Sequence, residues 1–410
     1  MTPTQADIAP GFRASAALSR LLHVGLIAVT VAFYLLVVMV SVGATHHRIA
    51  PGGAPLFYDF DAFYEAGRFA LRGDAAAAYD DAKMIAAEHR SFPGMTVRLP
   101  WNYPPSLQLI VAPLGALPYV AAWLVWSLAG YLAFLHAVQR VSRTHWAPLW
   151  LLAPAAAINL FFGQNALFSL AIVVSGVSHL ERRPILAGCL LGLLACKPQF
   201  AVAPVVLLAV GRHWRALGAA AASQAALAAA SALVLGPATW VEFVGRLSHP
   251  GSVFTSSSSD WRAIPSILTL ARTLGLPDSI ATAAHWLVAA GVVLLALRLW
   301  RRTTDPGYRA AITGTACVLI TPYLRGYDLA LLLPAVIVLS EAGLDRGQRL
   351  PSAILLAAAG LGWAAPALLM FTSPAVQLGP LISLAILGCL AWRLLGQPEP
   401  VGVTPNRRPT

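Results

Sequence analysis

Apolar residues occupy most of the chain in long runs, separated by short segments rich in Arg, Pro and Gly. These runs predict membrane-spanning helices at twelve places: 21–44, 119–138, 147–162, 165–180, 184–196, 200–212, 215–235, 279–300, 308–322, 326–342, 350–371 and 376–396. Several runs are shorter than the roughly 20 residues that a straight crossing needs, so we expect some helices to begin or end inside a cavity at membrane depth. The shorter, Pro-interrupted run 106–117 predicts a re-entrant or interfacial segment.

The composition supports a membrane protein. Of 410 residues, 58% are hydrophobic and 11% are charged, whereas soluble domains have roughly 25% charged residues. The expected fold is an all-α polytopic membrane protein, with about 12 transmembrane helices in one domain, 21–396. A cytoplasmic segment, 1–20, precedes this domain. A Pro-rich tail, 397–410, follows it and is expected to be disordered and cytoplasmic.

The basic residues indicate orientation rather than nucleic-acid binding. The net charge is +11, but Lys and Arg lie mostly in short loops between apolar runs and not on one solvated domain. Because cytoplasmic loops carry the excess of Lys and Arg, their distribution predicts that both termini are cytoplasmic. Two long segments, 45–105 and 236–278, then lie on the extracytoplasmic side. The four cysteines lie in apolar runs without CxxC spacing, which predicts small core residues and not a metal or redox site.

Six polar stretches fall on the predicted outer side. They are DFDAFYEAG and WNYPPS in the first long segment, then FGQNA, CKPQF, SSDWRAIPS and PYLRGYD. Their position on a single face predicts a shared cavity at the outer membrane boundary.

The first of these stretches predicts an amphipathic helix resting on the outer interface, with Asp59 at its N-terminus. Its apolar residues follow helical spacing and so share one face of the helix, and Glu65 and Arg68 lie outside that apolar face. Asp59 suits a helix N-cap and also a catalytic base, and the two roles are compatible if one carboxylate oxygen faces the cavity. We expect Glu65 and Asp74 to be solvated and the segment 79–81 to cap the next helix.

Lys197 lies between two short apolar runs, where a lysine costs a few kcal/mol unless it reaches the interface or meets an anion. It is either an interfacial anchor or part of an anion site, since Pro198 breaks the helix and the next helix begins with unpaired backbone donors. Arg325 repeats this arrangement between other helices. Lys197 and Arg325, with Arg262 as a third cation, are candidates for holding the phosphate of a lipid.

In this order, the motifs resemble bacterial integral-membrane glycosyltransferases of the GT-C class, and more narrowly the polyprenol-phosphate-mannose-dependent mannosyltransferases. The resemblance covers about residues 55 to 340. It rests on the ordered set DF, FYEAGRFALRGDAAAAYD, NYPP, LIVAPLGALP, GQNALFSLA, RRPILAGCLLGLLACKPQFAVAPVVLLA and TPYLRGYDLALLLPA.

The resemblance implies a GT-C-like enzyme of the plasma membrane, with an extracytoplasmic active site and a lipid-phosphate-linked sugar donor. It also implies an acidic general base in the first outer segment. The family's DF aspartate falls on Asp59, and its YPP, KPQ and YD motifs fall on Tyr103 to Pro105, Lys197 to Gln199, and Tyr327 with Asp328. Asp61 stands where relatives often have an apolar residue, so both aspartates remain candidates for the base.

The resulting hypothesis is an inverting hexosyl transfer, from a polyprenyl-phosphate sugar to the hydroxyl of a glycolipid or polysaccharide. The residues expected to bind substrate are Tyr103, Gln164, Asn165, Gln199, Trp261, Tyr327 and Asp328. No cofactor is expected. A divalent metal held by Asp59 and Asp61 is an alternative that the bulky Phe60 between them disfavours. The competing hypotheses are a lipid or lipid-linked-sugar transporter or flippase, and an inert scaffold protein.

Overall fold

The structure is a computed structural model that describes Leu35, Ile49 and residues 53–143, 153–248, 264–344, 349–371 and 377–396. Within these residues the fold is helical, with sixteen α-helices and several short 3₁₀ segments. An isolated β-bridge joins Ile49 and Pro55. The predicted all-α fold is confirmed. The predicted span 21–44, except Leu35, and the tail 397–410 lie outside the described residues.

Six helical segments in the described part of the chain are long and apolar enough to cross a membrane, so the chain is a multi-pass membrane protein. They lie in α5 (Tyr119–Val141), α11 (Trp214–Leu235), α15 (Asp278–Arg302), α18 (Arg349–Phe371), α19 (Leu378–Leu395) and the continuous pair η5 (Gly326–Leu332) and α17 (Leu333–Leu344). Each coincides with a predicted span. The larger number of twelve spans stays a prediction.

The other helices of this part are shorter, and three of the breaks at their ends carry polar motifs. They are α7 (Pro154–Phe162), α8 (Ala166–His179), α9 (Pro184–Gly192) with η3 (Leu193–Cys196), α10 (Pro198–Val210), α14 (Ile267–Thr273) and α16 (Pro306–Ile320). Several begin with Pro, because its fixed φ and missing N–H suit the first position of a helix. The breaks between helices therefore coincide with the motifs FGQNA, CKPQF and PYLRGYD.

Small residues let α9 and α11 pack in close contact. A Cβ added to Gly188 would lie 2.0 Å from the Ala216 carbonyl oxygen, and one added to Gly192 would lie 2.5 Å from the Ala220 carbonyl oxygen. Close backbone approach of this kind is a common way for helices to associate in a bilayer. This packing fixes α9 and the chain break at its end, which carries Lys197.

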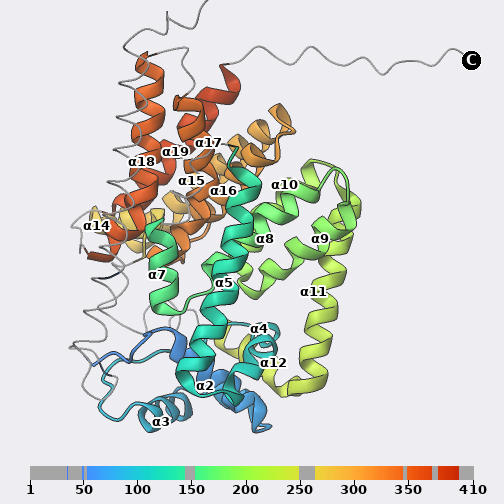
Figure 1. Ribbon diagram of the computed structural model, residues 1–410, viewed down its shortest axis with the longest axis vertical. Helices are drawn as coiled ribbons and strands as arrows, with labels where there is room; N and C mark the ends of the chain where they lie inside the picture. Colours follow the sequence, from blue (N-terminus) through green and yellow to red (C-terminus); the bar gives the residue numbers. More distant parts are fainter. Residues whose placement is uncertain are drawn as a thin grey trace, which may run out of the picture.

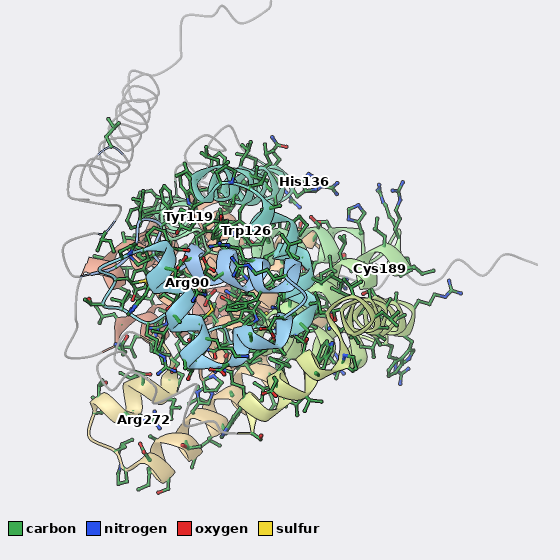
Figure 2. All side chains as sticks on the ribbon, turned by 90° about the horizontal axis from the view of Figure 1, so that it is seen from below. Arg90, Tyr119, Trp126, His136, Cys189 and Arg272 are labelled. Atoms are coloured by element: carbon green, nitrogen blue, oxygen red, sulfur yellow. The ribbon has the colours of Figure 1, made fainter. Side chains whose placement is uncertain are left out.

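Residues 53–117 form a layer at one end of the molecule, which we call the cap (Figure 1). Its elements are α2 (Phe60–Leu71), η1 (Ala75–Tyr79), α3 (Asp81–Ser91), α4 (Pro105–Val111) and η2 (Ala112–Ala116), and α12 (Pro237–Leu247) packs against it. Figure 2 looks onto this end, with α2 and α3 in front. The cap has its own buried cluster, rich in aromatic rings, apart from the cluster between the long helices.

The predicted helix after Asp59 is confirmed as α2, but it is buried on nearly every side instead of resting on an interface. Its tight fit depends on glycines, since a Cβ on Gly67 would lie 2.7 Å from the Val111 carbonyl oxygen and one on Gly115 would lie 2.6 Å from the Arg68 nitrogen. The run 106–117 forms α4 and η2 and packs against α2 and α11. The cap is thus a packed layer with its own core.

Two expectations about the acidic residues of the cap are confirmed and one is wrong. Asp80 caps α3 by accepting the Ala82 and Lys83 N–H groups, and Asp74 is exposed. Glu65, which we expected to be solvated, is 1% exposed. Its Oε1 accepts hydrogen bonds from Arg68 at 2.9 Å and from Ser91 at 2.5 Å, and these partners allow the carboxylate to be buried.

Candidate functional site

Asp59 holds the N-cap position of α2, but its carboxylate caps no backbone N–H of that helix. Its Oδ2 instead accepts a hydrogen bond from Gln164 Nε2, at 2.7 Å, although the two residues are 105 positions apart. The helix start is therefore as predicted, whereas the capping hydrogen bond is not found. The carboxylate is oriented by a side chain from the break between α7 and α8.

Gly163 shapes this break. It ends α7 with a φ of +64°, in the left-handed region that favours glycine, and a Cβ there would lie 2.5 Å from the Cβ of Phe60. The Trp126 indole N–H donates to the Gly163 carbonyl at 2.9 Å, and the Trp123 indole N–H donates to the Leu160 carbonyl at the same distance. These contacts place Gln164 directly against the start of α2.

Tyr103, from the NYPP motif, joins the same group of side chains. Its hydroxyl donates to Gln164 Oε1 over a long 3.4 Å. Burial raises the pKa of the Tyr103 phenol well above its ordinary value, and the nearby carboxylates of Asp328 and Asp59 raise it further. The phenol therefore stays protonated and lies close to both aspartates.

Lys197 and Asp328 form a buried ion pair. Lys197 Nζ lies 2.6 Å from Asp328 Oδ1, and the two side chains are 4% and 3% exposed. The second carboxylate oxygen, Oδ2, accepts the backbone N–H of Arg325 at 2.9 Å. Lys197 Nζ also lies within 5.5 Å of the ring centres of Phe200 and Tyr327. Asp328 thus holds the CKPQF and PYLRGYD breaks together.

Asn159 supplies a further link that the sequence analysis missed. This buried amide on α7 donates to the Tyr327 carbonyl at 3.1 Å and accepts the Ala166 N–H at 3.1 Å. It therefore connects the FGQNA break to the YD motif. A signal for it was present in the sequence, because an amide within an otherwise apolar run needs partners when buried.

Asp61 has a different environment from Asp59. It is fully buried, and neither carboxylate oxygen has a hydrogen-bond partner among the described residues. Burial raises its pKa well above the ordinary value, and Glu65 and then Glu88 raise it further. A carboxyl enclosed within the cap, without a hydrogen-bond partner among the described residues, is poorly placed to meet a substrate, so the geometry favours Asp59 over Asp61 as the candidate base.

Six of the predicted residues are linked by these contacts: Asp59, Tyr103, Gln164, Lys197, Tyr327 and Asp328. Asn165 is buried just before α8, Gln199 is the second residue of α10, and Arg325 precedes η5. Arg262 and Trp261 lie outside the described residues. Among the residues that the structure describes, no group of three or more His, Cys, Asp or Glu side chains could hold a metal ion.

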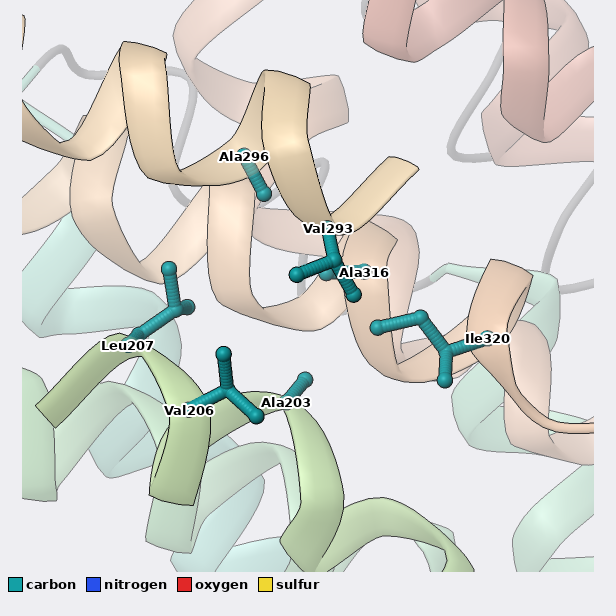
Figure 3. A pocket seen from close by; sticks show the side chains of 7 residues that line it. All are labelled: Ala203, Val206, Leu207, Val293, Ala296, Ala316 and Ile320. Carbon is teal, nitrogen blue, oxygen red and sulfur yellow. The ribbon is translucent and has the colours of Figure 1, made fainter. Parts of the chain in front are cut away.

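A separate cavity lies between α10, α15 and α16 (Figure 3). All the residues that line it are apolar: Ala203, Val206, Leu207, Val293, Ala296, Ala316 and Ile320. Because its lining offers no side-chain hydrogen-bond partner for hydroxyl groups, this cavity is unsuited to a sugar. The linked polar group of Asp59, Gln164 and Tyr103 is the candidate site.

Comparison with known proteins identifies the family. The sequence profile of glycosyltransferase family 87 matches residues 101–322, which make up more than half of the chain and include four of the six polar motifs. The chain belongs to glycosyltransferase family 87. It is therefore a membrane glycosyltransferase, and the prediction of an enzyme of this kind is confirmed.

One relative in this comparison comes from Mycolicibacterium smegmatis (strain ATCC 700084 / mc(2)155). It is the polyprenol-phosphate-mannose-dependent alpha-(1-2)-phosphatidylinositol pentamannoside mannosyltransferase. This family 87 chain is 28% identical to it over 370 residues, with 83% of each chain covered. No solved structure was found to match the chain.

Proposed function

We propose that this family 87 glycosyltransferase transfers a hexosyl residue, mannose, from a polyprenyl-phosphate donor to an acceptor hydroxyl on the extracytoplasmic side. The observation that carries the proposal is the carboxylate of Asp59, held by Gln164 beside Tyr103 and the Lys197–Asp328 pair. The donor named for the mycobacterial relative supports the choice of lipid-linked mannose. The basic residues of the short loops support the outer position of the cap.

Asp59 acts as the general base. Its ionised carboxylate takes the proton of the acceptor hydroxyl while the hydroxyl oxygen attacks the anomeric carbon of the donor. The new carbon–oxygen bond forms on the face opposite the phosphate, so the configuration at that carbon is inverted. Gln164 keeps the carboxylate in one orientation through Oδ2. Asp61, enclosed in the cap without a polar partner among the described residues, takes no part in this step.

The leaving group is the lipid phosphate, which departs with the electron pair of the broken carbon–oxygen bond. Lys197 stabilises the charge that develops on it. The ammonium group has three N–H donors, of which Asp328 Oδ1 takes one. Because Asp328 also neutralises much of the lysine charge, the mechanism takes the guanidinium of Arg325 as a second source of positive charge for the phosphate. Asp328 thus positions the Lys197 ammonium through Oδ1 and holds the backbone of Arg325 through Oδ2.

The acceptor in this proposal is a glycolipid, consistent with the phosphatidylinositol mannoside in the name of the mycobacterial relative. Tyr103, Gln164, Asn165, Gln199, Tyr327 and Asp328 remain the proposed sugar-binding residues, with Trp261 and Arg262 completing the site. Aromatic rings such as Tyr103 and Tyr327 offer an apolar face to a sugar ring, and the amides offer directed hydrogen bonds to its hydroxyls. These two kinds of group are what a hexose site requires.

Sugar transfer by the purified protein in lipid tests the proposal. The protein is supplied with radiolabelled polyprenyl-phosphate mannose and an extract of candidate acceptors, and wild type is compared with Asp59→Asn and Asp61→Asn. Removing a general base lowers a rate by about 10²–10⁴-fold, so Asp59→Asn is expected to lose transfer and Asp61→Asn to retain it. Full activity of Asp59→Asn would refute the mechanism. Movement of the donor between leaflets without transfer would favour a flippase.

A further inference from the structure

Arg246 connects α12 to the cap through a buried guanidinium. The sequence had placed this residue only within the second long outer segment, 236–278. Its Nε donates to Asn102 Oδ1 at 2.6 Å, its Nη1 to the Tyr79 carbonyl at 3.0 Å, and its Nη2 to Asp81 Oδ1 at 2.9 Å. The side chain is 9% exposed. A planar group with five N–H donors spread over three nitrogen atoms suits three separate acceptors, whereas the three donors of a lysine lie on one atom.

The acceptors of Arg246 lead directly to the candidate site. Asn102 precedes Tyr103 in the chain, and the Tyr79 hydroxyl donates to the Tyr103 carbonyl at 2.8 Å. Tyr103 is therefore held from both sides by groups that Arg246 binds. Its own hydroxyl donates to Gln164, which in turn holds the carboxylate of Asp59. The contacts form a continuous chain from α12 to the proposed base.

The remaining surface of α12 indicates why it provides a firm support. Thr239, Phe243 and Arg246 lie on the face turned to the protein, whereas Val241 and Val244 on the other side are 69% and 57% exposed. The end of α11, which directly precedes α12 in the chain, also exposes apolar side chains, those of Leu233 and Val234. Since α11 is long and apolar enough to span the membrane, the same lipid can cover both helices.

We propose that Arg246 is a positioning residue for the transfer reaction, which holds Tyr103, and through it Gln164 and Asp59, against a helix anchored at the outer membrane surface. The expected loss of transfer rate on replacing Arg246 rests on the proposed function, whereas the hydrogen-bonded support of Tyr103 does not. The proposal also requires that the FGQNA break becomes less ordered when Arg246 is replaced.

The first test compares Arg246→Gln, Arg246→Lys and the control Arg98→Gln. Arg98 pairs with the same Asp81 carboxylate, but the side chains of Arg98 and Asp81 are each 39% exposed. We expect Arg246→Gln to lower kcat at least tenfold while KM for the donor changes less than threefold, because the donor-binding cations are untouched. Arg246→Lys should recover part of the rate, and Arg98→Gln should stay within twofold of wild type.

A double-mutant cycle shows whether Arg246 acts through Tyr103. Tyr103→Phe removes the hydroxyl that contacts Gln164, so adding Arg246→Gln should reduce kcat by less than it does in the wild type. Additive effects, or an Arg246→Gln protein with a lower thermal midpoint and a wild-type kcat, would overturn the proposal. If Arg246→Gln does not fold, Tyr79→Phe removes the hydrogen bond to the Tyr103 carbonyl and is expected to lower kcat in the same way.

Hydrogen exchange gives a readout that does not depend on the reaction. Faster exchange of amides in 101–104 and in 160–166 is expected for Arg246→Gln and not for Arg98→Gln. Faster exchange confined to 237–248 would mean that Arg246 stabilises only its own helix and would overturn the proposal. An inactive wild type or an active Asp59→Asn would count against the proposed function, but neither result would change the exchange rates by which the role of Arg246 is tested.

Discussion

The buried Lys197–Asp328 pair gives a prediction whose size follows from the geometry. At 2.6 Å and an effective dielectric constant of about 20, the attraction between unit charges is about 6 kcal/mol, before the cost of removing both from water. Replacing one partner leaves the other charge buried without its partner, which typically costs about 3–5 kcal/mol. We therefore expect Lys197→Met and Asp328→Leu each to destabilise the protein by about that amount.

The double variant separates the stability of the pair from its role in the reaction. With both charges replaced by apolar side chains of similar size, no buried charge remains, so Lys197→Met/Asp328→Leu should be more stable than either single variant. Sugar transfer should stay lost in all three. Lys197→Met and the double variant remove the cation that binds the phosphate, and Asp328→Leu removes the carboxylate that positions Lys197. The apparent free energy of unfolding is measured by titrating the protein with a denaturing detergent in mixed micelles. Single variants within about 1 kcal/mol of wild type, or a double variant no better than the weaker single one, would refute this account of the pair.

Three further predictions test other parts of the site and the cap. Burial raises the pKa of Glu88 to about 8 from an ordinary 4.5, and the nearby Glu65 raises it further. As pH rises through this range, Glu88 loses its proton in the unfolded chain before it does so in the folded protein. The free energy of unfolding therefore falls by about 1.4 kcal/mol per pH unit between these two values. Unfolding midpoints at pH 5 and pH 8 should therefore differ less in Glu88→Gln than in wild type. The control Glu242→Gln, at an exposed position, should show the same difference between the two midpoints as wild type. Gly163→Ala, at a φ of +64° and with its Cβ 2.5 Å from that of Phe60, should lower both the thermal midpoint and kcat, while Gly218→Ala, whose Cβ meets nothing within 4 Å, should lower neither. Gln164→Leu removes the hydrogen bond to Asp59 and should lower kcat at least tenfold in the transfer assay, and an unchanged kcat would mean that Asp59 needs no such orientation.

The positions of the helices could be predicted because the signal for them is local. Apolar runs mark each long helix, and Pro or Gly marks the breaks at Gly163 and Lys197. The segment 79–81 was expected to cap a helix, and the backbone N–H groups that Asp80 accepts there lie within three residues of it. Most features that depend on neighbouring residues alone were therefore found, although the Asp59 carboxylate contacts Gln164 and does not cap its own helix.

The burial of Glu65 could not be predicted in this way. Its carboxylate is enclosed because Ser91, 26 positions away, and Arg68 supply its hydrogen bonds, and because α2 is covered on nearly every side. Helical spacing indicates which residues share a face of α2. It does not indicate how many other elements cover that helix, and this number decided whether the acidic face met water.

The same reasoning explains why the sequence singled out residues of the candidate site but not which of them contact one another. A polar side chain within a membrane protein needs a partner, and backbone polar groups are unpaired at chain breaks, so functional residues concentrate at the breaks that Pro and Gly mark. Each partner comes from another break: Asp328 lies 131 positions from Lys197, and Gln164 lies 105 positions from Asp59. Arg246 lies 144 positions from Asn102 and was overlooked, because an arginine in a long outer segment such as 236–278 is usually solvated. The buried polar pairs are thus where the fold adds information that the order of the motifs does not contain.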